Sequence, residues 1–157
     1  MSNIKVRVID CHIARYNNNK SDWEFLLLKR NMNTLYPGTW QGVTGKIELS
    51  EIPYKTALRE LMEETGLVAY RLFTVDKVNT FYDANRDTMN LIPVFGAIVK
   101  SNDVKLSNEH TEFKWCNVNE TKRFITWDQQ KKGVQIFYDM LTNDDNRLKL
   151  MEIQINE

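Results

Sequence analysis

Short apolar runs separated by polar turns follow one another along most of this chain. Runs rich in β-branched and aromatic residues predict strands. They cover residues 3–16, 23–30, 39–47, 67–82, 90–99 and 112–118. Within the second run the sequence FLLL is continuously apolar, so this strand is expected to be buried on both faces of a sheet.

Two segments repeat apolar residues at the spacing of a helix instead. The first begins at Pro53, which suits a first helical position, and ends near Gly66, a natural C-terminal cap. Its predicted buried face consists of Tyr54, Ala57, Leu58, Leu61 and Thr65. Because Ile52 has no side-chain oxygen, we expect Ser50 or Glu51 to cap the start of this helix.

The second helix is predicted to begin at Thr126-x-x-Gln129, a pair spaced as in a capping box, and to extend to about Leu141. Beyond it, apolar residues recur at nearly alternate positions between Leu148 and Ile155, which predicts a strand with a bulge. We predict that residues 144–157 add to a sheet edge or to a neighbouring subunit, the latter giving a homodimer. Together the elements predict one domain over residues 1–157, with a mixed sheet and two main helices.

Composition adds limits on partners and location. The chain has 157 residues, 42% of them hydrophobic and 27% charged, as in a soluble globular protein. Its 21 basic and 21 acidic residues cancel, so no overall field recruits nucleic acid or an anionic membrane. The chain shows neither a membrane-spanning apolar run nor the apolar core of a signal peptide, so a cytoplasmic location is expected. Cys11 and Cys116 lie far apart in strand-like segments and are expected to be buried free thiols.

Three carboxylates on the first predicted helix form a candidate functional site. Glu60, Glu63 and Glu64 stand at i, i+3 and i+4, which puts them on one arc about 100° wide. Carboxylates at these spacings repel one another, and a divalent cation would remove that cost. Mg²⁺ prefers oxygen ligands and commonly bridges carboxylates to phosphate groups. A solvated acidic helix face explains the same spacing without a ligand.

The wider pattern around these carboxylates favours the metal. Gly45-x5-Glu51-x7-Arg59-Glu60-Leu61-x-Glu63-Glu64-x-Gly66-Leu67 resembles the complete signature of the Nudix hydrolases. The resemblance implies an α+β fold, the Nudix α/β/α sandwich, with a mixed β-sheet, a loop–helix–loop motif and a C-terminal helix. It also implies that water attacks phosphorus in a nucleoside diphosphate linked to another group, with the help of bound metal.

The resemblance further implies roles for individual residues. Mg²⁺, with Mn²⁺ as an alternative ion, is expected to bind Glu60, Glu63, Glu64 and the carbonyl of Gly45. Arg59 is expected to anchor these ligands, paired with Glu51, and Glu48 is a further acidic candidate. Two glutamates, Glu109 and Glu112, compete for the role of catalytic base. His110 is expected to be structural or solvent-facing and not a ligand.

Substrate contacts are sought among cations and aromatic residues near the signature. Arg30 at a strand end and Lys46 beside the metal ligands could bind phosphate. A base could stack on Trp40, or on Tyr36, Phe81 or Tyr82, although aromatic residues in strands also serve as core.

The run WQGVTG at Trp40–Gly45, with EHTEFKW and ITWDQQKKGVQIF later on, resembles the bacterial dihydroneopterin triphosphate and dATP pyrophosphohydrolases. This likeness implies a nucleoside or pterin triphosphate substrate, cleaved to monophosphate and pyrophosphate. Three alternatives stay open. They are a Nudix hydrolase of dinucleoside polyphosphates or nucleotide sugars, a non-catalytic nucleotide-binding module, and a structural calcium or protein-docking site.

Overall fold

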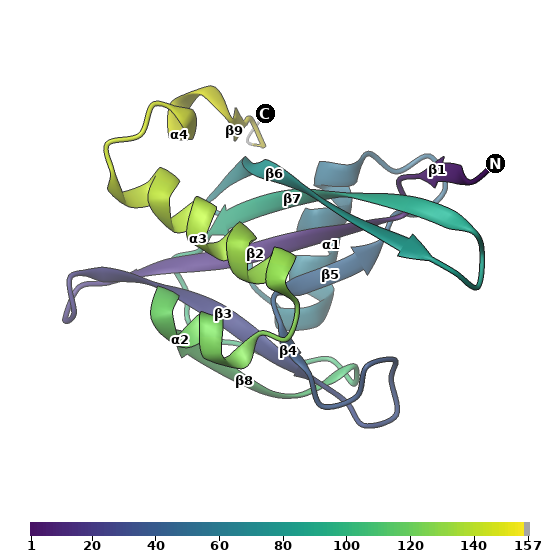
Figure 1. Ribbon diagram of the computed structural model, residues 1–157. Coiled ribbons are helices and arrows are strands. Elements are labelled where there is room, and N and C mark those ends of the chain that lie inside the picture. Colours follow the sequence, from purple (N-terminus) through teal and green to yellow (C-terminus); the bar gives the residue numbers. More distant parts are fainter. Residues whose placement is uncertain (156–157) are drawn as a thin grey trace.

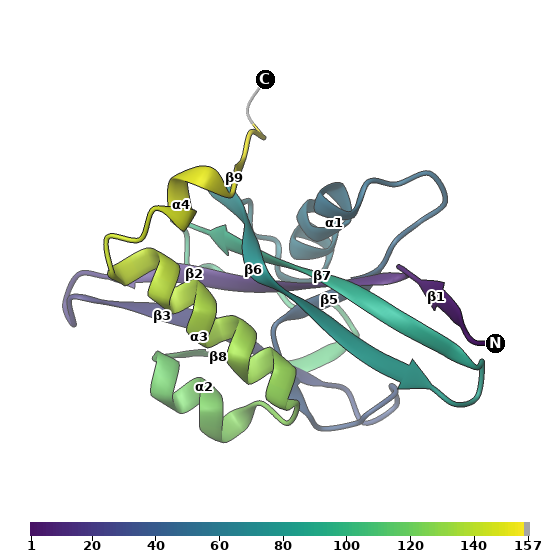
Figure 2. The same ribbon diagram turned by 45° about the horizontal axis from the view of Figure 1, so that its top comes forward.

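A mixed β-sheet separates helix α1 (Pro53–Thr65) on one face from helix α3 (Asp128–Thr142) on the other, as Figures 1 and 2 show. This computed structural model describes residues 1–155 of the chain. The layers are those of the expected α/β/α sandwich, so the α+β prediction is confirmed.

Nine strands lie within residues 1–155. They are β1 (Asn3–Lys5), β2 (Val8–Asn17), β3 (Asp22–Arg30), β4 (Trp40–Gln41), β5 (Val43–Lys46), β6 (Arg71–Asp83), β7 (Thr88–Ile98), β8 (His110–Cys116) and β9 (Glu152–Ile153).

Strand β2 organises the sheet because it pairs on both sides. One side runs parallel to β7, while the other is antiparallel to β5 along its first half and to β3 along its second half. Strand β3 carries β8 and β4, and β7 carries β6, whose outer edge takes β9. The pairing of β2 with β5 places the signature glycine, Gly45, opposite Ile9 in the middle of the sheet.

Alternation along β2 sends its side chains to two separate cores. Ile9, Cys11 and Ile13 pack with Ala57 and Leu61 of α1. On the opposite face, Ala14 packs in the cluster that contains Phe25, Val134 and Phe137. The sheet therefore fixes α1 by a continuous apolar contact, which gives its polar residues a rigid support.

Several predicted strand boundaries need correction. The predicted strand 3–16 is divided into β1 and β2. Lys5 pairs with Asn90 of β7 and Asp10 pairs with Val94, so this part of the chain has one residue more than the β7 segment opposite it. The extra residue is accommodated at residues 6 and 7, which belong to neither strand. The predicted strand 39–47 breaks at Gly42, where an added Cβ would lie 2.9 Å from the carbonyl oxygen of Cys11. The predicted strand 67–82 begins only at Arg71.

Helix α1 begins and ends where the sequence predicts, but its N-terminal capping does not follow the prediction. Ile52 is the N-cap residue, and no side chain provides a capping hydrogen bond. Pro53 occupies the first turn, where a missing N–H costs nothing. Gly66 adopts φ = 72° as the C-cap, and its N–H donates to the carbonyl of Met62. Glu51 does not cap the helix because its carboxylate is engaged by Arg59 and Thr56.

The region before α3 contains a helix that the periodicity did not predict, α2 (Val118–Phe124). Its capping box joins Asn117 and Glu120 through two reciprocal hydrogen bonds of 2.9 Å. The capping box predicted at Thr126 is wrong, because α3 follows Trp127 without a side-chain cap. Gln129 instead binds the backbone N–H and carbonyl of Thr80 on β6.

The tail confirms the predicted strand only in part. Residues 147–150 form a short helix, α4 (Arg147–Leu150), and only β9 joins the sheet, antiparallel to the edge of β6. Arg71 and Glu152 form a bidentate ion pair of 2.8 and 2.9 Å beside this edge. Residues 156 and 157, the end of the predicted extension, lie outside the described residues. The tail thus extends the sheet of its own chain, and the homodimer stays a prediction.

Two further expectations concern the thiols and the membrane. Cys11 and Cys116 are both free and buried, as predicted. Among the helices of residues 1–155, none combines the length and apolar composition that crossing a bilayer requires.

Candidate active site

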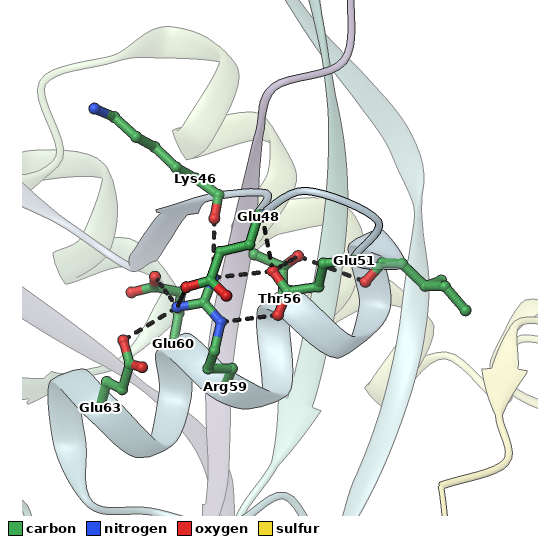
Figure 3. Close-up of polar contacts among 8 residues, drawn as sticks. Lys46, Glu48, Glu51, Thr56, Arg59, Glu60 and Glu63 are labelled. Atoms are coloured by element: carbon green, nitrogen blue, oxygen red, sulfur yellow. Dashed lines mark hydrogen bonds and ion pairs between the residues drawn. The ribbon is translucent and has the colours of Figure 1, made fainter.

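The guanidinium of Arg59 lies at the centre of a group of carboxylates on the exposed side of α1 (Figure 3). It donates hydrogen bonds to Glu51, Glu60, Glu63 and the carbonyl of Lys46. Glu48 lies 3.6 Å from the same guanidinium as an ion-pair partner. One cation therefore holds the loop 47–52 and two carboxylates of α1 in a fixed arrangement.

The pairing of Arg59 with Glu51 is bidentate, as the sequence predicts. Nε donates to Oε2 at 2.8 Å, and Nη2 donates to Oε1 at 3.0 Å. Thr56, a residue that sequence reasoning missed, also donates its hydroxyl to Glu51 at 2.7 Å. These hydrogen bonds, first of all those from Arg59, lower the pKa of Glu51 to about 2. Glu51 is therefore committed to Arg59, and it is the other carboxylates that remain available to a ligand.

Glu60 lies directly over Gly45 of β5. A Cβ added to Gly45 would overlap the side chain of Glu60, so only glycine lets the helix approach the strand this closely. Arg59 donates to Glu60 at 2.7 Å, but burial outweighs this contact and raises the pKa of Glu60. The two predicted ligands Gly45 and Glu60 are thus adjacent.

Glu64 is the most buried of the three helix carboxylates, with 3% of its surface exposed. Burial raises its pKa to about 10, and the negative charges of Glu60 and Glu109 add to the effect. One of its oxygens, Oε2, has no hydrogen-bond partner in the part of the chain that the structure describes. A buried carboxylate of this kind is costly unless it is paired or binds a cation.

Glu109 lies beside Glu64, whereas Glu112 does not. The ligand atoms of Glu64, Glu109 and His110 lie within 4.8 Å of one another. Glu112 points elsewhere and pairs with Lys29 at 3.1 Å. Of the two candidate bases, only Glu109 is therefore near the helix carboxylates.

His110 is buried and therefore not solvent-facing, whereas the structural role expected for it stays a prediction. It is 4% exposed, and neither ring nitrogen has a partner among residues 1–155. Arg30 is its register partner across β3 and β8, and the positive charge of Arg30 partly opposes the rise in the pKa of Glu64. Arg30 therefore lies close to this part of the site, and its Nε donates to the carbonyl of Leu35.

The other predicted substrate contacts are less closely grouped. Lys46 directs its exposed side chain away from the carboxylates of α1, while its carbonyl accepts from Arg59 (Figure 3). Trp40 is half-buried and packs edge to face on Phe124, with the ammonium of Lys114 4.7 Å from its ring centre. Trp40 is therefore a core aromatic residue on the α3 face of the sheet.

Other aromatic residues remain exposed. Tyr36 and Trp127 form an edge-to-face pair with ring centres 5.1 Å apart, and Phe81 and Tyr82 are exposed on β6. Trp127 was not among the residues that the sequence singled out.

A buried polar group on the α3 face also escaped sequence reasoning. Asp10 accepts from Asn79 at 2.7 Å and from Gln130 at 3.5 Å, and all three side chains are buried. Burial raises the pKa of Asp10 to about 6. The three residues come from β2, β6 and α3, so no local sequence pattern could have joined them.

The donor set on α1 suits a hard divalent cation. Glu64 and Glu109 offer carboxylate oxygens within 4.8 Å of each other, and Glu60 is near enough for its charge to act on Glu64. The partnerless Oε2 of Glu64 is the kind of atom that a cation satisfies. Glu63 is 57% exposed, and its free oxygen faces solvent beside Arg59. A cation held by these carboxylates would neutralise phosphate charge and activate water.

Comparisons with known proteins agree with this chemistry. The NUDIX domain model matches residues 7–136. Bis(5'-nucleosyl)-tetraphosphatase (asymmetrical) from Rattus norvegicus is 30% identical over 116 residues, covering 71% of this chain and 76% of the rat protein. Dihydroneopterin triphosphate diphosphatase from Haemophilus influenzae is 42% identical over 61 residues, covering 35% of this chain and 39% of that protein.

A solved structure supports the same assignment at the level of the fold. The binary complex of Caenorhabditis elegans Ap4A hydrolase superposes with a TM-score of 0.71 at 20% identity, covering 88% of this chain and 99% of that one. The matched domain, the complete signature and the carboxylates around Arg59 lead to one conclusion. This chain belongs to the NUDIX family and is a Nudix hydrolase, an enzyme of phosphoric anhydride bonds that is in general metal-dependent.

Proposed function

We propose that Glu60, Glu63, Glu64 and the carbonyl of Gly45 bind Mg²⁺, or Mn²⁺ in its place, and that Glu109 completes the site. The observation that carries this proposal is the buried, partnerless oxygen of Glu64 beside Glu60 and Glu109. Arg59 keeps the loop and the helix carboxylates together, as a positioning residue.

Each residue then has a part in water attack on phosphorus. The bound ion supplies charge neutralisation at the phosphate and lowers the pKa of bound water. Glu109, exposed and adjacent to Glu64, holds the ion through one carboxylate oxygen and accepts the proton of the attacking water at the other. Arg30 binds phosphate oxygens, and Lys46 does so once its exposed side chain turns toward the carboxylates of α1.

For the substrate we propose a nucleoside or pterin triphosphate, cleaved to monophosphate and pyrophosphate. The run WQGVTG at Trp40–Gly45 and the 42% identity to the Haemophilus influenzae enzyme support this choice. The exposed rings of Tyr36 and Trp127 offer stacking surfaces for the base.

A second candidate is asymmetric cleavage of a dinucleoside tetraphosphate. It is favoured by the rat relative, whose 30% identity extends over 116 residues, about twice the length of the bacterial match. Both candidates use the same site. They differ in whether the phosphate chain of the substrate carries one nucleoside or pterin group, or a nucleoside at each end.

Product analysis distinguishes the two candidates. Purified protein with Mg²⁺ is incubated with dATP, the other nucleoside triphosphates, dihydroneopterin triphosphate, diadenosine tetraphosphate and ADP-ribose. Pyrophosphate and a monophosphate from a triphosphate support the first candidate, and ATP with AMP from diadenosine tetraphosphate supports the second. Turnover of none of them, with nucleotide still bound, would support a binding module instead.

Glu109→Gln and Glu112→Gln provide a matched pair for the base. We expect Glu109→Gln to lower kcat by about 100-fold or more, because a general base typically contributes that much. Glu112→Gln should stay within about threefold of the unmodified enzyme, since its carboxylate lies at Lys29. Equal losses in the two variants would remove Glu109 from the mechanism.

A further inference from the structure

His110 is a buried histidine that lacks the usual reason for burial. It is 4% exposed, and neither Nδ1 nor Nε2 has a hydrogen-bond partner within residues 1–155. A structural imidazole normally donates from one nitrogen and accepts at the other, because unpaired buried polar atoms cost stability. His12, the other histidine of the chain, also leaves Nε2 partnerless, but it faces Gly133 of α3 on the opposite side of the sheet.

The position of His110 brings a ring nitrogen close to two carboxylates. Strand β8 begins at His110, directly after the exposed Glu109, and its pairing with β3 directs this end of the strand toward Glu64. One nitrogen of His110 and one carboxylate oxygen each from Glu64 and Glu109 lie within 4.8 Å of one another. The partnerless Oε2 of Glu64 belongs to the same place.

These distances fit three ligands of one ion. With metal–ligand bonds of about 2.1 Å, neighbouring ligands of an octahedral ion lie about 3 Å apart and opposite ones about 4.2 Å apart. Small rotations of the side chains therefore let all three atoms reach a single centre.

We propose that His110 binds the active-site ion through a ring nitrogen and makes this site selective for a divalent transition metal over Mg²⁺. Imidazole suits transition-metal ions such as Fe²⁺, Co²⁺, Ni²⁺ and Zn²⁺, whereas Mg²⁺ takes oxygen ligands almost exclusively. The inference rests on the proposed function in one respect, the location of the ion at Glu64 and Glu109. It adds a nitrogen ligand and a class of metal.

Nitrogen NMR tests the ligand directly in the unmodified protein. With ¹⁵N-labelled histidine and diamagnetic Zn²⁺, only two imidazoles contribute signals. We expect a ring nitrogen of His110 to shift on titration to one equivalent, while His12 stays unchanged as an internal control. An unshifted His110 at full Zn²⁺ occupancy would overturn the proposal.

Calorimetry tests the selectivity. His110→Leu removes both nitrogens and keeps a buried apolar side chain, so it should fold, which circular dichroism verifies. We expect this variant to lose at least about 10-fold in affinity for Co²⁺ while its affinity for Mg²⁺ changes by less than about threefold. Glu112→Gln, a change on the same strand, should bind both ions as the unmodified protein does.

Failure of this inference is distinguishable from failure of the proposed function. If Co²⁺ and Mg²⁺ bind and His110→Leu leaves both affinities intact, His110 is no ligand and the carboxylate site stands. If Glu64→Gln also leaves both affinities intact, the proposed location of the ion is wrong as well. Equal losses for Mg²⁺ and Co²⁺ in His110→Leu would overturn the selectivity.

Discussion

Arg59 connects more charged groups than its neighbours on α1, and its geometry explains why lysine is no substitute. The guanidinium forms a bidentate pair with Glu51 while other N–H groups reach Glu60, Glu63 and a backbone carbonyl. A lysine ammonium is a point donor that cannot span these partners.

We therefore predict that Arg59→Lys lowers kcat by about 10- to 100-fold, as loss of a residue that orients ligands typically does. The free energy of unfolding should fall by about 1 to 2 kcal/mol, since Glu51 loses its bidentate partner. Steady-state kinetics and urea denaturation measure the two effects. Lys55→Arg on the same helix is the control, and equal kcat values for Arg59→Lys and this control would contradict the positioning role.

Asp10 gives a prediction on pH and stability. Burial raises its pKa from 3.8 to about 6 in the folded protein, so the folded state holds the proton more tightly than the unfolded state. The stabilisation is therefore complete below the unfolded pKa and is lost as pH rises through about 6. The loss amounts to about 3 kcal/mol for a shift of this size.

Asp10→Asn removes this titration and offers an amide to the partnerless oxygens of Asn79 and Gln130. We expect the variant to gain stability over the unmodified protein as pH rises from about 4 to about 7. Urea denaturation across that range measures the difference, with the exposed Asp103→Asn as control. A difference that stays constant with pH would show that Asp10 keeps an ordinary pKa.

At the scale of elements, the contact of α1 with β5 positions two residues of the proposed site, Glu60 and Gly45. The side chain of Glu60 lies where a Cβ at Gly45 would be, so this glycine sets the distance between helix and strand. Gly66 has a different role, since its φ of 72° ends the helix without touching the carboxylates.

Gly45→Ala should consequently displace Glu60 and weaken Mg²⁺ binding by at least about 10-fold. Gly66→Ala should cost about 1 kcal/mol of stability through its left-handed backbone but leave Mg²⁺ affinity unchanged. Calorimetry and thermal unfolding of both variants separate the two effects. Unaltered Mg²⁺ affinity in Gly45→Ala would show that Glu60 does not depend on this contact.

The tail provides a second prediction about elements. Leu148 and Met151 pack against the α3 core, and Ile153 and Ile155 pack against the α1 core. Removing residues 144–157 should therefore lower the free energy of unfolding by about 2 kcal/mol or more. The exposed edge of β6 should also reduce solubility. Urea denaturation and light scattering test this, and an unchanged midpoint would mean that β9 is not anchored.

The success of sequence reasoning differs between these elements for physical reasons. Helix α1 was predictable because Pro53, its apolar face and Gly66 are local signals. Helix α2 was missed, since its seven residues are too few for a periodic pattern, although Asn117 and Glu120 carried a capping signal. The breaks at residues 6–7 and at Gly42 depend on register and close contacts with other strands, which periodicity cannot reveal.

At the scale of the whole molecule, the sheet separates two groups of polar residues. One face carries α1 with its acidic cluster, while the other carries α3 over the buried group Asp10, Asn79 and Gln130. The signature made the α1 side predictable from one continuous stretch. His110 and Asp10 could not be assigned from sequence, because their surroundings are assembled by β8, β2, β6 and α3.

The most direct test of the account compares the unmodified enzyme with Glu64→Gln, a change that keeps the shape of the side chain but removes its ability to ionise when a cation binds. Turnover of the best substrate and thermal unfolding are measured with and without the divalent ion. We predict that the ion raises the Tm of the unmodified protein only, and that Glu64→Gln lowers kcat by about 100-fold or more. Full turnover and an unchanged ion-dependent rise in Tm for Glu64→Gln would contradict the assignment of the active site to this carboxylate cluster.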